Sequence, residues 1–174
     1  MTNSQLSKND TPVVAILTGS PSDLPVVLKA REVLDSLDVP NDVRVLSAHR
    51  TPRETAEYIA AAEKQGVEVF IACAGMAAHL AGAVAAHTMR PVIGVPIASG
   101  ALQGVDALLA TVQMPPGVPV ATVGVDGAKN AAFLAARIVA LTHREVHERL
   151  VAHLEDSKKR YDSPDPSVPG QAAT

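Results

Sequence analysis

The feature that most constrains the fold is a fivefold alternation between short apolar runs and longer segments with helical periodicity. The apolar runs are nearly free of charged residues, as strands buried on both faces of a parallel sheet are. They cover residues 12–17, 43–46, 67–72, 91–96 and 119–125. Strands that alternate with helices in this way predict a parallel sheet covered by helices on both faces.

The segments between the strands carry ordinary helix signals. Thr51 is expected to cap a helix that starts at Pro52 and ends before Gly66. The last helix is expected to run unbroken over residues 128–155, with increasing charge toward its end. The expected helices cover residues 24–37, 52–65, 77–88, 105–112 and 128–155.

The length of the chain suits one domain with a sizeable core. It has 174 residues, of which 47% are hydrophobic, so a packed globule is expected. Residues 1–11 read as a flexible N-terminal tail and residues 12–155 as a single α/β catalytic domain. Residues 156–174 are rich in Pro and Ser and are expected to form an extended or mobile C-terminal tail.

Charge and composition exclude several classes of partner. The formal net charge is -3, with 15 basic and 18 acidic residues, so there is no strong positive field for nucleic acid. Aromatic residues make up only 2%, too few for base-stacking or flavin-stacking walls. No apolar stretch of membrane-spanning length is free of polar interruption. The single cysteine, Cys73, lies in an apolar run and fits a buried position in a cytoplasmic protein.

Three unusual segments follow the first three predicted strands, at residues 18–23, 47–50 and 73–80. An open α/β sheet binds its ligands beyond the carboxyl ends of its strands. The segments are therefore expected to meet at one edge of the sheet and to form a site there.

The first segment contains Gly19, Ser20, Ser22 and Asp23. Its hydroxyls and the amides of the next helix are suited to hold an anion. An ordinary helix cap by Ser22 or Asp23 explains the same residues, and local sequence alone favours that reading. The segment matches neither a Walker A loop nor a dinucleotide-binding fingerprint.

The second segment places Ser47, His49 and Arg50 at one strand end. Arginine makes a bidentate, permanently charged contact to phosphate, and histidine takes and gives a proton near neutral pH. The combination predicts a phosphorylated substrate that undergoes proton transfer. The alternative is that His49 caps a helix and Arg50 is simply solvated. The position of both residues at the sheet edge favours the functional interpretation.

The third segment runs through Ala74, Gly75, His79 and Leu80, where small residues let the backbone close around a small ligand. His79 reads as a pocket-lining or structural residue in preference to a second acid or base. His143 and His147 lie four apart on a predicted helix, but no third ligand is near them, so no metal site is expected.

With these segments in place, the sequence resembles the N5-carboxyaminoimidazole ribonucleotide mutase family of purine biosynthesis, from about Val13 to about Leu150. The matching stretches are GSPSD (19–23), SAHRTP (47–52), AGMAAHLAG (74–82), RPVIGVP (90–96), GVDALLATVQMPPGVPVATV (104–123) and KNAAFLAARI (129–138). The fold expected for such a chain is a three-layer, flavodoxin-like doubly wound parallel sheet of order 2-1-3-4-5 with a long C-terminal helix.

The resemblance implies a reaction and a role for each site residue. N5-carboxyaminoimidazole ribonucleotide would lose its carboxyl group as carbon dioxide and be recarboxylated at the ring carbon, giving 4-carboxy-5-aminoimidazole ribonucleotide. His49 would be the general acid and base of this isomerase. The binding roles are phosphate for Ser20, Ser47 and Arg50, ribose for Asp23, and enclosure of base and carbon dioxide for Ala74, Gly75, His79 and Leu80. No cofactor or metal is implied, and family members form homo-octamers.

Two residues depart from the family's usual loop. Met76 stands where a second Gly is usual and Ala81 where Pro is usual. Met76 is expected to narrow the pocket or to occupy a left-handed backbone position, and Ala81 to loosen the loop. Two alternatives stay open at this stage: direct carboxylation of aminoimidazole ribonucleotide, and a non-catalytic flavodoxin-like binding module. Arg50 and the Ala-Ala-His-Leu stretch favour the mutase over the direct carboxylase.

Overall fold

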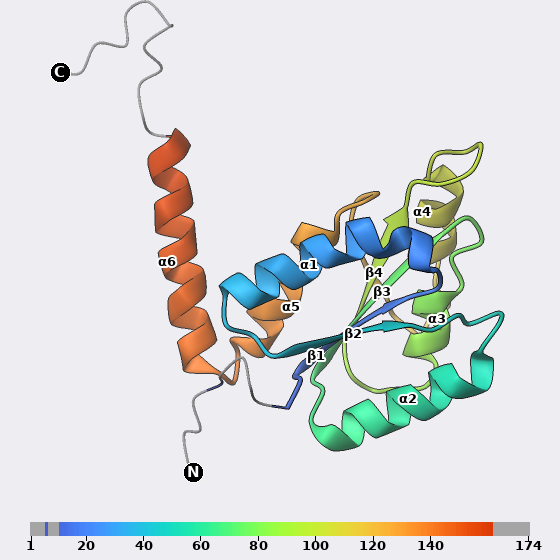
Figure 1. Cartoon of the computed structure of the whole chain (residues 1–174), viewed down its shortest axis with the longest axis horizontal. Helices are drawn as coiled ribbons and strands as arrows, with labels where there is room; N and C mark the ends of the chain where they lie inside the picture. The colour runs from blue at the N-terminus through green and yellow to red at the C-terminus, as the bar shows by residue number, and fades with distance from the viewer. Residues whose placement is uncertain (1–5, 7–10, 162–174) are drawn as a thin grey trace, which may run out of the picture.

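A parallel five-stranded sheet forms the centre of the molecule (Figure 1). The computed structural model describes residue 6 and residues 11–161. The strands lie in the order β2-β1-β3-β4-β5, which confirms the predicted doubly wound, flavodoxin-like fold. Their bounds are β1 Val14–Thr18, β2 Asn41–Val45, β3 Val69–Gly75, β4 Val92–Ile97 and β5 Ala121–Thr122.

Helices cover both faces of this sheet, and alternate residues of each central strand feed two separate cores. Val14 and Ile16 of β1 pack toward α1 and α5, whereas Ala15 and Leu17 pack toward α2 and α3. In Figure 1, α1 and α5 lie on one side of the sheet and α2 on the other. The helices are η1 Pro21–Asp23, α1 Leu24–Ser36, α2 Pro52–Gln65, α3 Leu80–Ala85, α4 Val105–Val112, α5 Ala128–Val139 and α6 Arg144–Tyr161.

The third helix is shorter than its sequence predicts. A helix was expected over residues 77–88, but α3 covers only Leu80–Ala85. The backbone of Met76 and Ala78 is left-handed, with φ of 51° and 43°, and such residues cannot continue a right-handed helix. The segment between β3 and α3 is therefore a longer loop than predicted, and His79 stands at the start of the helix.

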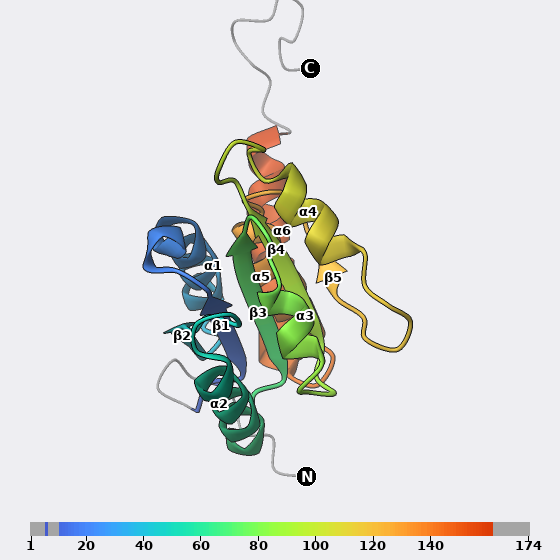
Figure 2. The ribbon, with the colours of Figure 1, turned by 90° about the vertical axis from the view of Figure 1, so that its right-hand side faces the viewer.

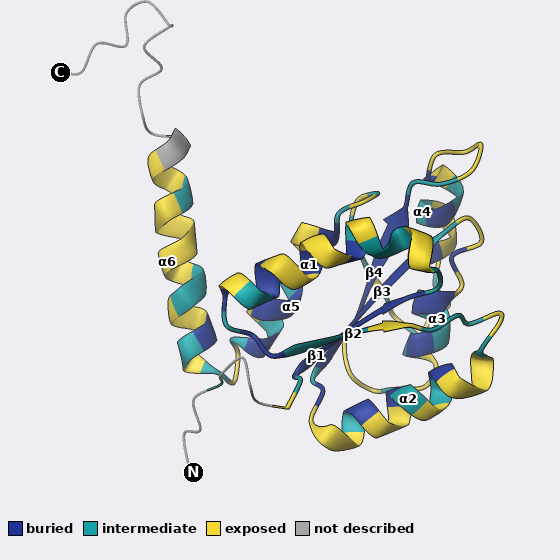
Figure 3. Ribbon diagram, viewed as in Figure 1, coloured by how far each residue is buried: buried dark blue, intermediate teal, exposed yellow. Residues whose placement is uncertain are grey.

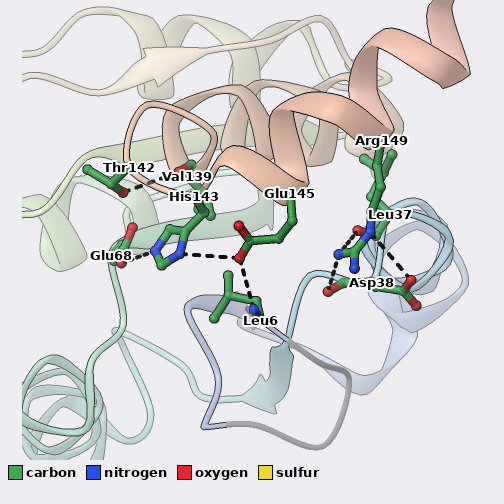
Figure 4. Close-up of polar contacts among 9 residues, drawn as sticks. All are labelled: Leu6, Leu37, Asp38, Glu68, Val139, Thr142, His143, Glu145 and Arg149. Atoms are coloured by element: carbon green, nitrogen blue, oxygen red, sulfur yellow. Dashed lines mark hydrogen bonds and ion pairs between the residues drawn. The ribbon is translucent and has the colours of Figure 1, made fainter. Parts of the chain in front are cut away.

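The prediction of one helix over residues 128–155 is wrong, because the chain breaks between α5 and α6. The turn at the end of α5 tightens: Leu141 N–H donates to Ile138 O (3.1 Å) and Thr142 N–H to Val139 O (3.1 Å). His143 then contacts Glu68, with its Nε2 2.8 Å from Oε1 (Figure 4). His143 is thus partly buried in this connection.

The last helix projects away from the sheet and is mostly exposed along its length (Figure 3). Its first turn is attached to the N-terminal segment, because the N–H of Leu6 donates to Oε1 of Glu145 over 2.8 Å. This bond is the main cause that holds the pKa of Glu145 below its ordinary value. None of the helices within the described residues is both long and apolar enough to cross a bilayer.

The predicted tails fall largely outside the described residues, which exclude 1–5, 7–10 and 162–174. The predicted domain end at residue 155 lies inside α6, which continues to Tyr161. Residues 156–161, placed by the sequence in an extended or mobile tail, are helical. The remaining domain boundaries stay predictions.

Candidate functional site

A pocket of about 200 Å³ opens at the carboxyl edge of the sheet. It is built by the loops after β1, β2 and β3, and one residue from the loop after β4 completes its wall. All site residues predicted from the sequence line this pocket: Ser20, Asp23, Ser47, His49, Arg50, Ala74, Gly75, His79 and Leu80. The expectation that the three segments meet at one edge of the sheet is met by their positions.

The loop after β1 carries a connected set of hydroxyls. The Ser22 hydroxyl donates to Asp23 Oδ1 over 3.0 Å, so its oxygen can only accept in the 2.8 Å contact with Ser20 Oγ. Ser20 also caps η1 by accepting the N–H of Ser22 over 3.3 Å. Asp23 stands at the N-cap position of α1 but makes no side-chain cap bond there. The predicted cap by Ser22 or Asp23 is therefore not formed; Ser20 caps the segment and also lines the pocket.

The loop after β2 is closed by Thr51, and the predicted side-chain cap of α2 is not formed. The Thr51 hydroxyl instead donates to Ser47 O (3.1 Å) and accepts the N–H of Ser47 (2.9 Å). The hydroxyl oxygen of Ser47 accepts the N–H of Arg50 over 3.3 Å. The threonine thus closes a tight turn, and the three residues inside it, Ala48, His49 and Arg50, line the pocket.

The loop after β3 closes tightly against the loop after β4. A Cβ atom on Gly75 would collide with Ser99 Oγ and would lie 3.2 Å from Ile97 O, so only glycine fits there. Met76 occupies the left-handed position that the sequence suggested, at a φ of 51°. Its side chain is 60% exposed and packs toward Gly100. Met76 therefore extends over the rim of the pocket instead of filling it.

Two histidines from opposite walls meet in the pocket. Nε2 of His49 lies 2.6 Å from Nδ1 of His79, and the ring planes are inclined by 74°. A hydrogen bond at this distance needs one nitrogen to donate and the other to accept. The two rings therefore form a hydrogen bond, which places a pair of groups capable of proton transfer beside the polar loops.

The rim carries a positive charge that is available to a ligand. Among the described residues, the guanidinium of Arg50 has no carboxylate within ion-pair distance. The backbone N–H of Arg50 is held by Ser47, so the side chain alone is free to turn. Within the same residues no group of three His, Cys, Asp or Glu side chains is placed to hold a metal ion. The pocket is suited to an anionic ligand such as a phosphate monoester.

A comparison with known families identifies this arrangement. The profile of the family described as AIR carboxylase matches residues 13–160 of the chain. The chain belongs to the AIR carboxylase family. The matched range contains every element from β1 to α5, and with them all the loops of the pocket.

Relatives of this AIR carboxylase family member share about half of its residues. The chain is 56% identical over 148 residues to the N5-carboxyaminoimidazole ribonucleotide mutase of Pyrococcus abyssi, covering 85% of each chain. It is 50% identical over 146 residues to the enzyme of the same name from Escherichia coli K12, covering 83% of this chain and 86% of that one. The crystal structure of Treponema denticola PurE superposes with a TM-score of 0.77 at 29% identity, covering 86% of this chain and 94% of that one.

The family pocket contains one polar residue that the sequence reading missed. Ser99, in the loop after β4, lines the wall with its hydroxyl oxygen buried and without a hydrogen-bond partner among the described residues. The glycine-rich stretch after the fourth strand was read only as a loop. The signal that could have identified Ser99 was its position just after a central parallel strand. The strand β4 ends at the same edge of the sheet as β1 and β3.

Cys73, just below the pocket, is fully buried at the end of β3. Burial, and secondly the nearby negative charge of Asp23, raises the pKa of its thiol to about 12. The thiolate is the reactive form of cysteine, so this residue acts as a small apolar side chain and not as a nucleophile.

Proposed function

We propose that this protein converts N5-carboxyaminoimidazole ribonucleotide into 4-carboxy-5-aminoimidazole ribonucleotide, as an isomerase of purine biosynthesis. The observation that carries the proposal is the contact of His49 with His79 in a pocket that is also lined by Arg50, whose guanidinium has no carboxylate partner within the described part of the chain. It combines proton transfer with anion binding in one pocket. Relatives that share 47–56% of its residues carry the name of this mutase.

The reaction needs two proton transfers and no change of oxidation state. A proton from His49 reaches the exocyclic nitrogen as the bond between this nitrogen and the carboxyl carbon breaks, which releases carbon dioxide and the free amine. The ring carbon then attacks the retained carbon dioxide. His49 removes the proton from that ring carbon and returns to its starting state, so atoms and protons balance over one turnover.

The other pocket residues bind and enclose the substrate in this proposal. Arg50, Ser20 and Ser47 hold the phosphate, and the carboxylate of Asp23 accepts hydrogen bonds from the ribose hydroxyls. The contact with His79 holds the His49 ring in one orientation. The loop from Ala74 to Leu80 presents small and apolar groups around the base, which helps to retain carbon dioxide.

We further propose that the enzyme works as a homo-octamer in the cytoplasm, without a cofactor. The exposed face of α4 and its preceding loop supports assembly, with residues spaced three or four apart on one side of the helix. These residues are Leu102, Val105, Leu109 and Val112, which are 50–60% exposed. In Figure 2, α4 lies at the upper right, above α3 and next to β5. Light scattering should give a mass well above the monomer, and a stable monomer would contradict assembly.

The decisive experiment is a two-substrate assay with and without bicarbonate. The proposal expects turnover of N5-carboxyaminoimidazole ribonucleotide without ATP, added metal or bicarbonate. Conversion of the plain amine only, in proportion to dissolved carbon dioxide, would identify a direct carboxylase instead. No conversion of either ribonucleotide, with no binding detected by calorimetry, would contradict the mutase and the carboxylase alike and leave a non-catalytic role.

A further inference from the structure

Asp126 lies in the connection between β5 and α5, outside the pocket lining. It makes three hydrogen bonds to backbone groups of other residues. Its N–H donates to Pro96 O over 2.8 Å, and its carboxylate Oδ1 accepts the N–H of Ala98 over 3.0 Å. Its main-chain carbonyl accepts the N–H of Ala128 over 2.9 Å. The backbone of Asp126 is left-handed, with a φ of 55°.

In this pattern, a side-chain carboxylate takes the place of one backbone carbonyl in the hydrogen bonding of the sheet. In a parallel ladder, a residue donates its N–H to one carbonyl of the neighbouring strand and accepts a later N–H of that strand with its own carbonyl. Asp126 donates to β4 in this way, but its left-handed turn directs its carbonyl to Ala128 at the start of α5. The carboxylate takes the place of the missing carbonyl and satisfies the N–H of Ala98.

Ala98 is the first residue of the loop that closes the pocket wall. The next residue, Ser99, has its hydroxyl directly against Gly75, and Gly100 lies against Met76. At the other end of the loop, Gly104 is so close to Ala98 that an added Cβ would lie 3.1 Å from the Ala98 Cα atom. The position of Ala98 therefore determines where Ser99 meets the loop after β3.

We infer that Asp126 is a positioning residue for the pocket: through Ala98 it holds Ser99 against Gly75 and keeps the wall around the retained carbon dioxide closed. The inference deepens the proposed function and rests on it for the identity of the retained fragment. The part that concerns the wall rests only on the contacts of Asp126, Ala98, Ser99 and Gly75.

Three variants separate the acceptor from the backbone conformation. Asp126→Asn keeps an acceptor oxygen and tolerates a left-handed backbone. Asp126→Ala loses the acceptor and keeps the strain, whereas Asp126→Gly loses the acceptor and relieves the strain. If the acceptor oxygen holds the pocket wall, Asp126→Ala and Asp126→Gly should behave alike, and Asp126→Asn should behave like the parent protein.

The first readout is amide hydrogen exchange, which needs no substrate. In Asp126→Ala and Asp126→Gly, exchange over residues 98–104 should rise about tenfold, because the N–H of Ala98 loses its acceptor. Exchange over residues 75–78 should rise with it. Unchanged exchange in either segment would overturn the link, whereas parent-like exchange in Asp126→Asn supports it.

The second readout is the fate of the substrate's carboxyl group. The two variants without the acceptor should release about five times more free aminoimidazole ribonucleotide per product formed than the parent does, since a looser wall lets carbon dioxide escape. Raised exchange with an unchanged product ratio would overturn the role in retaining carbon dioxide. A parent enzyme that does not consume the substrate would refute the proposed function, and the exchange data would still decide whether Asp126 positions the wall.

Discussion

The loops after β1 and β2 and the loops after β3 and β4 build the two sides of the pocket by different means. On the first side, short polar side chains make bonds within a few residues of sequence: the Ser22 hydroxyl donates to the carboxylate of Asp23, and the Thr51 hydroxyl accepts the backbone N–H of Ser47. On the second side, the backbone itself is shaped by left-handed residues and close glycine contacts.

Under the proposed function, the difference corresponds to what each side would hold. An anionic phosphate is bound by groups that donate hydrogen bonds or carry positive charge, and short polar side chains at helix starts provide them. A small neutral fragment such as carbon dioxide offers little to bond, so it can be retained only by a wall without gaps. Four predictions test this division, from the largest expected effect to the smallest.

The largest effect is expected for His49, which lies on the first side of the pocket and contacts His79 on the second. His49→Asn should lower kcat about 10²–10⁴-fold, because it removes the proton-transferring group, while the affinity for the ribonucleotide changes little. Steady-state assays and calorimetry measure both quantities. The control is His87→Asn, which changes an exposed histidine outside the pocket that bonds Ala83 O over 2.7 Å. Parent-like turnover in His49→Asn would remove His49 from the mechanism.

The polar side is tested by Arg50→Ala. Loss of a charged hydrogen bond to phosphate should weaken ribonucleotide binding about 10–100-fold. Binding of the corresponding nucleoside, which lacks the phosphate, should not change, and the comparison isolates the contact between Arg50 and the phosphate. The control is Arg53→Ala, because Arg53 is exposed and paired with Glu57. Equal losses for nucleotide and nucleoside would show that Arg50 does not bind the phosphate.

The backbone-shaped side is tested by Gly75→Ala. The added methyl group would collide with Ser99 and approach Ile97 O, so the free energy of unfolding should fall by about 1–3 kcal/mol. Gly19→Ala is the matched control on the polar side, because no atom lies within 4 Å of its added Cβ; its effect should stay within about 0.5 kcal/mol. Urea denaturation at one protein concentration compares the two. Equal losses of stability in Gly75→Ala and Gly19→Ala would show that the backbone is packed no more tightly on one side of the pocket than on the other.

The smallest effect is expected for Met76→Gly. Glycine relieves the left-handed backbone at a φ of 51° but loses the packing toward Gly100, so stability should rise by no more than about 1 kcal/mol. Met89→Gly changes a 96% exposed methionine that is not left-handed, and it should lower stability by about 0.5 kcal/mol. Thermal unfolding gives the sign of each change. A loss in Met76→Gly as large as in Met89→Gly would show that this position is not strained.

Local pattern was enough to predict a parallel sheet covered by helices and the edge at which the site lies, but not the bounds of α3 or the break between α5 and α6. Periodicity and chain order located the segments after the first three strands, and every predicted site residue lies in the pocket. The apolar neighbours of Cys73 also indicated that it is buried, and the departure from the family's usual loop singled out Met76. These are properties of single segments, which neighbours in the sequence determine.

The tertiary structure alone decided how the segments contact one another. The break after Val139 depends on tightened turns and on the contact between His143 and Glu68, which are far apart in sequence. The distance of 2.6 Å between His49 and His79, the position of Ser99 behind Gly75 and the bond from Ala98 to Asp126 depend on how adjacent strands are aligned. The sequence determined which groups reach the sheet edge, and strand order and close packing decided which of them touch, because parallel strands bring together loops that are distant in the chain.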